Sequence, residues 1–182
     1  MSKTKVEKYI SEVCPHCAQS TTYLLGLDKG SVEILMDILK FISAKGINEL
    51  HPKKETDWAT NKEKTWFLTN LSRPRFFGLI AYVKEKKGYY CLTKKAGKFL
   101  RGEDIEQYAI ISKSTGHNIG YWQPEKYRIN LKEILKSDEL PYWEGDQQKI
   151  INIIDPIIYS GQQTLFEQKT FNFVLRQERV NA

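Results

Sequence analysis

Residues 71–100 read LSRPRFFGLIAYVKEKKGYYCLTKKAGKFL, and this stretch decides the fold that the sequence predicts. Its short apolar runs are separated by glycines and a charged turn, which favours several short elements over one long helix. The pattern predicts a helix that starts near Asn70 or Ser72 and ends at Gly78, followed by a β-hairpin and another helix. We expect the hairpin strands at Leu79–Val83 and Tyr89–Leu92, the turn between them at Lys84–Gly88, and the next helix at Lys94–Leu100, capped by Thr93.

Upstream of this stretch, apolar spacing predicts one long helix, Ser31–Lys45. Gly30 and Ser31 would form its N-terminal cap, and Gly46 would end it. A short helix is expected within Lys53–Phe67. Pro74 is compatible with its own helix only in the first turn, where its missing N–H has no partner in any case. The expected order is therefore helix, short helix, helix, hairpin, helix.

Charge is concentrated in the same region. The chain has 182 residues and a formal charge of +6, and residues 62–101 contain 11 basic and two acidic residues, a net charge of 11 − 2 = +9. Such density is typical of a surface that binds phosphates, because bound Lys and Arg release counterions from nucleic acid. A solvated lysine-rich face is the alternative.

Composition excludes several classes of protein. A hydrophobic content of 41% excludes a disordered chain. The longest apolar stretch, around Ile150–Ile158, is interrupted by Asp155 and Pro156, so no membrane span is expected. Three cysteines disfavour a disulfide framework, and we expect a cytoplasmic protein. Enzyme motifs such as a Gly-rich phosphate loop or His-Glu-x-x-His are missing from the sequence, so we predict a protein that is not an enzyme.

Two local motifs resemble the winged helix-turn-helix superfamily. One is Leu71–Ile80, which is similar to the end of a recognition helix entering a wing, and the other is Tyr90–Leu100, which is similar to a wing strand followed by LT-x-x-G-x-x-F-L. Gly97 falls one place late, and Pro74 is unusual in a recognition helix. The resemblance covers about residues 30–102. It implies an α+β protein with a winged helix core at 30–102, an N-terminal segment at 1–29 and a small aromatic-rich C-terminal α/β extension at 103–182.

In such domains the recognition helix enters the major groove and the wing touches the DNA backbone or the minor groove. The residues that the resemblance places against DNA are Asn70, Ser72, Arg73 and Arg75 in the helix, Lys84, Lys86 and Lys87 in the wing, and Lys94, Lys95 and Lys98 in the following helix. For the two arginines the alternative is a salt bridge, and for each lysine it is solubility. The function expected is that of a transcriptional regulator that binds double-stranded DNA, as a homodimer by analogy. The alternative is a protein-interaction module, such as an inhibitor or assembly factor of a nucleic-acid machine.

Cys14 and Cys17 have the Cys-x-x-Cys spacing of half a zinc site. Completing a structural zinc site would take scattered residues or a second copy of the chain; the other candidates are His16, His51, Cys91 and His117. A thiol redox role or a merely packed pair of cysteines are the alternatives.

The C-terminal third is rich in aromatic residues. They are Trp122, Tyr127, Tyr142 and Trp143, and they form either a second small core or a surface for a protein partner. We expect strands at Tyr108–Ser112 and Ile119–Trp122 and a helix at Leu131–Leu135 capped by Asn130. The run Thr170–Leu175 alternates for a few residues and could pair as a strand.

Overall fold

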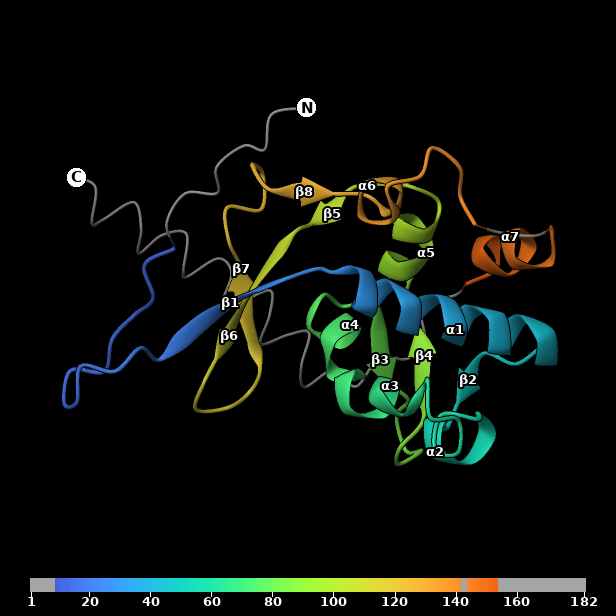
Figure 1. The fold of residues 1–182 in the computed structure, drawn as a ribbon, viewed down its shortest axis with the longest axis horizontal. Coiled ribbons are helices and arrows are strands. Elements are labelled where there is room, and N and C mark those ends of the chain that lie inside the picture. The colour runs from blue at the N-terminus through green and yellow to red at the C-terminus, as the bar shows by residue number, and fades with distance from the viewer. Residues whose placement is uncertain (1–8, 142–143, 154–182) are drawn as a thin grey trace.

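A computed structural model describes residues 9–141 and 144–153 of the protein. Its class is α+β, as predicted (Figure 1). The long helix α1 lies at the centre, among shorter helices and three small antiparallel sheets. In the described part of the chain, no helix is long and apolar enough to cross a membrane.

Helix α1 (Lys29–Lys45) begins two residues before the predicted start. The predicted cap at Gly30 and Ser31 is wrong, because the side chain of Asp28 accepts a hydrogen bond from the Ser31 N–H at 2.8 Å and caps the helix instead. Gly46 ends the helix in the left-handed conformation at φ 64°, as predicted. The helix buries a wide apolar stripe, because it packs against α4, α6 and α7.

Three short helices follow: α2 (Pro52–Glu55), α3 (Thr65–Asn70) and α4 (Ser72–Phe76). Only Leu71, itself in a helical conformation, separates α3 from α4. Pro74 lies in the first turn of α4, as predicted, where the helix loses no internal hydrogen bond. Gly78 follows with φ 69°, which turns the chain into the first strand of the hairpin.

The predicted hairpin is present as β3 (Ile80–Tyr82) and β4 (Tyr90–Leu92). A two-residue strand after α1, β2 (Glu49–Leu50), pairs with the other edge of β4, so the sheet order is β2-β4-β3. Helix α5 (Lys94–Leu100) has the predicted bounds, and Thr93 caps it by accepting from the Ala96 N–H at 3.1 Å.

A second sheet joins one strand from before α1 with two strands from after α5. Its strands are β1 (Thr22–Gly26), β6 (Tyr108–Ser112) and β7 (Asn118–Tyr121), in the order β1-β6-β7. Strand β6 has the predicted bounds, β7 starts one residue earlier than predicted, and β1 was not predicted. Residues before position 30 and after position 103 therefore share one sheet, rather than forming a separate lead-in and extension.

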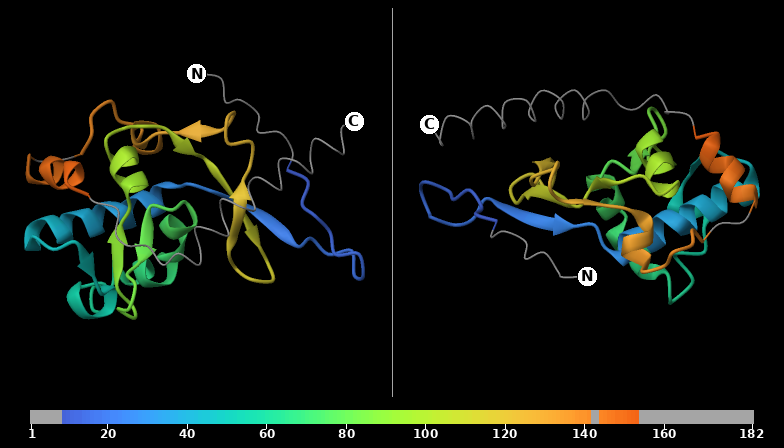
Figure 2. Two further views of the ribbon diagram at one scale, coloured as in Figure 1. Left: turned by 180° about the vertical axis from the view of Figure 1, so that it is seen from behind. Right: turned by 90° about the horizontal axis from the view of Figure 1, so that it is seen from above.

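The remaining elements lie above α1 in the view of Figure 1. They are β5 (Ile105–Glu106) paired with β8 (Arg128–Ile129), α6 (Leu131–Leu135) and α7 (Glu144–Ile151), and Figure 2 shows them from behind and from above. Asn130 caps α6, as predicted, and the cap is part of a capping box with Glu133. Two of the C-terminal aromatics pack within the fold, Trp122 against Tyr9 and Tyr127 against Tyr108. Tyr142, Trp143 and Thr170–Leu175 lie outside the described residues.

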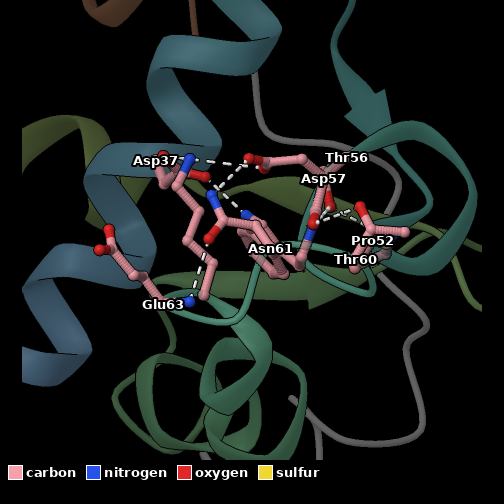
Figure 3. Close-up of polar contacts among 9 residues, drawn as sticks. Asp37, Pro52, Thr56, Asp57, Thr60, Asn61 and Glu63 are labelled. Carbon is pink, nitrogen blue, oxygen red and sulfur yellow. Dashed lines mark hydrogen bonds and ion pairs between the residues drawn. The ribbon is translucent and has the colours of Figure 1, made fainter.

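Buried Trp58 anchors the loop between α2 and α3 to α1. Its indole N–H donates to Asp37 Oδ2 of α1 at 2.5 Å, and its ring meets Phe67 of α3 edge to face at 5.1 Å. Lys64 Nζ binds the other Asp37 oxygen at 3.0 Å, and this hydrogen bond raises the pKa of Lys64 (Figure 3). One carboxylate thus holds both ends of the loop and fixes where α3, and with it α4, begins.

Candidate nucleic-acid interface

Three side chains from α4 and the hairpin meet in what we call the arginine–tyrosine cluster: Arg75, Tyr82 and Tyr90. The guanidinium carbon of Arg75 lies 4.9 Å from the ring centroid of Tyr82, within the range of a cation–π contact. Tyr82 and Tyr90 face each other across the β3–β4 ladder, with ring centroids 4.7 Å apart. Tyr82 remains 39% exposed. The cluster therefore presents a fixed cation and an aromatic face at the surface.

Within the cluster, the phenol of Tyr90 stays protonated near neutral pH. Burial raises the pKa of Tyr90, and the hydrogen bond and charge of Tyr82 raise it further, while Arg75 acts in the opposite direction. Within the described residues, Arg75 has no carboxylate partner, and its Nε is buried without a hydrogen bond. Its charge is consequently not neutralised by an ion pair in the described chain.

The hairpin tip carries two exposed lysines, Lys84 and Lys87. The third predicted wing residue, Lys86, turns back and forms an ion pair with Glu49 of β2, which raises the pKa of Lys86. The tip is tied to the start of α2 through His51. Gly88 has φ 84°, and a Cβ atom there would come within 2.7 Å of His51 Nε2, so only glycine fits.

Arg73 and Lys95 are bound within the protein. Arg73 forms an ion pair with Asp28, the residue that caps α1. Lys95 Nζ lies 2.6 Å from Glu106 Oε2 of β5 and 3.1 Å from the hydroxyl of Tyr121. Burial raises the pKa of Glu106, but Lys95 and the other partners of this carboxylate outweigh that effect, so its pKa is lowered. Both cations therefore link elements of the fold.

The other predicted contact residues differ in their surroundings. Asn70 donates its side-chain amide to the Trp66 carbonyl of its own helix at 2.9 Å, and Ser72 is half-buried at the start of α4. Lys94 and Lys98 are exposed, one helical turn apart on α5.

Five of the 11 basic residues in positions 62–101 pair with carboxylates from outside that window. They are Lys64, Arg73, Lys86, Lys95 and Arg101. The acids are Asp28, Asp37, Glu49, Asp57, Glu103 and Glu106. The net charge of the segment in sequence therefore overstates the charge available on the surface. Of the six other basic residues in the segment, five lie on α4, at the hairpin tip and on α5, and the sixth is Lys62.

The second sheet, of order β1-β6-β7, holds the end of α4 in place. Asn118 of β7 donates its side-chain amide to the Phe76 carbonyl, and the Tyr121 hydroxyl lies 3.5 Å from the same oxygen. Carbonyls at a helix end have no partner within the helix, so these side chains satisfy one of them. Arg75 is the residue just before Phe76, and its position depends on this contact.

Sequence reasoning missed the two tyrosines of the cluster. Tyr82 and Tyr90 are each separated from the basic turn by one residue. This symmetric spacing is the signal that could have identified them as a cross-strand pair.

Cys14 and Cys17 lie together at the tip of a separate hairpin, in which Val13 pairs with Ser20. Backbone N–H groups of His16 and Cys17, together with the Cys17 thiol, donate to Cys14 and lower its pKa. In contrast, burial raises the pKa of Cys91 to about 11. Over residues 9–141 and 144–153, no three His, Cys, Asp or Glu side chains gather in a way that could hold a metal ion.

Comparisons of the chain with protein-family models, with curated proteins and with solved structures returned no match.

Proposed function

We propose that this protein binds double-stranded DNA with α4 and the β3–β4 hairpin, as a winged helix protein that regulates transcription. The observation that carries the proposal is the arginine–tyrosine cluster. Arg75 is held on Tyr82 without a carboxylate partner in the described chain. Lys84, at the hairpin tip, lies two residues after Tyr82. Two residues of extended chain span at most about 7 Å, so a tip cation lies close to the cluster.

The sheet topology supports the winged helix interpretation. A helix, a short strand, three further short helices and a hairpin follow one another, and the short strand β2 closes the sheet beside β4. In this arrangement α4 would enter the major groove, and the hairpin tip would reach the adjacent backbone. Arg75 would contact a base edge, guanine O6 and N7 being its preferred partners, while Lys84 and Lys87 would bind phosphates. Lys98 would add a backbone contact from α5.

Arg73 and Arg75 provide a matched test, because they are chemically identical and two residues apart in α4. We expect Arg75→Ala to lower the affinity for a selected duplex by about tenfold or more and to weaken its sequence preference. Arg73→Ala should change the affinity by less than about threefold, because its guanidinium is bound to Asp28. Fluorescence anisotropy with the selected duplex and with a scrambled duplex measures both effects.

Equal losses in the two variants would contradict the proposal, because they would show that charge alone, and not the cluster, determines affinity. Arg75→Lys separates the contribution of the positive charge from that of the guanidinium N–H donors. It retains the positive charge but loses the fork of N–H donors, so we expect affinity for scrambled DNA to persist while sequence preference falls.

A further inference from the structure

The hairpin that carries Cys14 and Cys17 projects from the body of the molecule (Figures 1 and 2). Its base is a single bridge, Val13 to Ser20, extended by a hydrogen bond from the Thr21 N–H to the Glu12 carbonyl at 2.8 Å. The residues between the two cysteines are exposed, and so is Cys17. The two thiols are thus at the tip of an arm rather than inside a core.

Backbone hydrogen bonds close a tight turn around the two cysteines. The Ala18 N–H donates to the Cys14 carbonyl at 2.8 Å, and the Cys14 N–H donates to the Gln19 carbonyl at 2.8 Å. Ala18 takes the left-handed conformation at φ 55°, which folds the chain back after Cys17.

The described residues of one chain do not complete the site. Zn²⁺ in structural sites takes four ligands, and thiolate and imidazole are its preferred ones. The chain's other cysteine, Cys91, is buried in β4, and His51 is packed against the hairpin tip around Gly88. In the described residues, neither these side chains nor His117 joins the cysteine pair in a cluster of three ligands.

We infer that one Zn²⁺ bridges two copies of this protein, with Cys14 and Cys17 of each copy as its four ligands. A two-fold axis through the metal relates two identical half-sites and gives a closed pair. Binding converts four thiols to thiolates and releases their protons to the solvent. The inference goes beyond the proposed function and does not depend on it.

An independent feature of the same arm favours a second copy as the occupant. The described structure exposes five large hydrophobic side chains, and three of them lie on the arm or the strand that follows it. They are Ile10, 81% exposed, Val13, 61% exposed, and Tyr23, 41% exposed. A zinc-bridged pair would bring two copies of this apolar surface close to the metal, where each could cover the other.

The test measures metal content and mass on the full-length reduced protein. Saturation with Zn²⁺ should give about one zinc per two chains, and light scattering should give the mass of two 21.3 kDa chains. EDTA should halve the mass. Co²⁺ in place of Zn²⁺ should saturate at the same ratio with the absorption of a tetrahedral site of four thiolates.

Three variants make the test specific. Cys14→Ser with Cys17→Ser should bind no zinc and remain a monomer, while circular dichroism shows that it is folded. Cys91→Ala and His16→Gln should keep both the metal and the pair. One zinc per chain in a monomer, loss of zinc in His16→Gln, a Cys14–Cys17 disulfide in place of metal binding, or a dimer that persists in the double variant would each overturn the inference.

Discussion

Reversing the two lysines at the hairpin tip, by Lys84→Glu with Lys87→Glu, is expected to lower the affinity for duplex DNA by about a hundredfold at low salt. Each reversal removes a phosphate contact and adds a repulsion, and about tenfold for each charge corresponds to about 1.4 kcal/mol. Both side chains are exposed on a turn, so the substitutions should leave the free energy of unfolding within about 0.5 kcal/mol. Anisotropy titrations and urea denaturation measure the two quantities.

A control variant changes the net charge equally at another place. Lys113, in the turn between β6 and β7, and Lys132, on α6, are both exposed. Lys113→Glu with Lys132→Glu should cost less than about threefold in affinity, because neither residue belongs to α4, α5 or the β3–β4 hairpin. If both double variants lost affinity equally, binding would reflect only the overall charge of the protein, and the hairpin would have no particular role.

The largest effect on stability is expected at Trp58. Trp58→Ala should lower the free energy of unfolding by about 3–5 kcal/mol, because it removes a fully buried indole and leaves a cavity. Trp58→Phe keeps an aromatic ring but loses the hydrogen bond to Asp37 and part of the packing of the indole, so a smaller loss of about 1–3 kcal/mol is expected. Urea denaturation of both variants measures the difference.

Glu63 serves as the control for Trp58, because it lies in the same loop with an exposed side chain (Figure 3). Glu63→Ala should change the free energy of unfolding by no more than about 0.5 kcal/mol. A loss below about 1 kcal/mol in Trp58→Ala would show that the loop does not depend on the indole, and the account of how α3 and α4 are positioned would then be wrong.

Local signals in the sequence predict local elements of this fold. Thr93 followed by Lys94–Leu100 contains its own cap and helical pattern, and the structure has that helix within the same bounds. Asp28 was overlooked as a cap because Ser31 is also a good capping residue; the backbone conformation of Asp28 decides between them. Strand β1 was missed because its partner, β6, lies more than 80 residues further along the chain, and its five residues carry little pattern of their own.

In the candidate site, too, local sequence signals do not show which residues contact one another in the fold. Arg73 and Arg75 are equivalent in sequence, and only packing separates them, since one binds Asp28 and the other rests on Tyr82. Similarly, Lys86 and Lys95 belong to the basic segment but pair with Glu49 and Glu106, which lie outside it. A count of charges along the sequence cannot detect such ion pairs, because only the folded structure brings these acidic residues next to the basic ones.

The measurement that tests the central claim most directly is the salt dependence of duplex binding by the unmodified protein. Arg75, Lys84, Lys87 and Lys98 correspond to about four backbone or groove contacts, so a plot of log affinity against log salt concentration should have a slope of about −3 to −4. In the Lys84→Glu, Lys87→Glu variant the slope should be shallower by about two. A slope near zero, or no binding at low salt, would contradict DNA binding through α4 and the hairpin, and the protein-interaction alternative would then take its place.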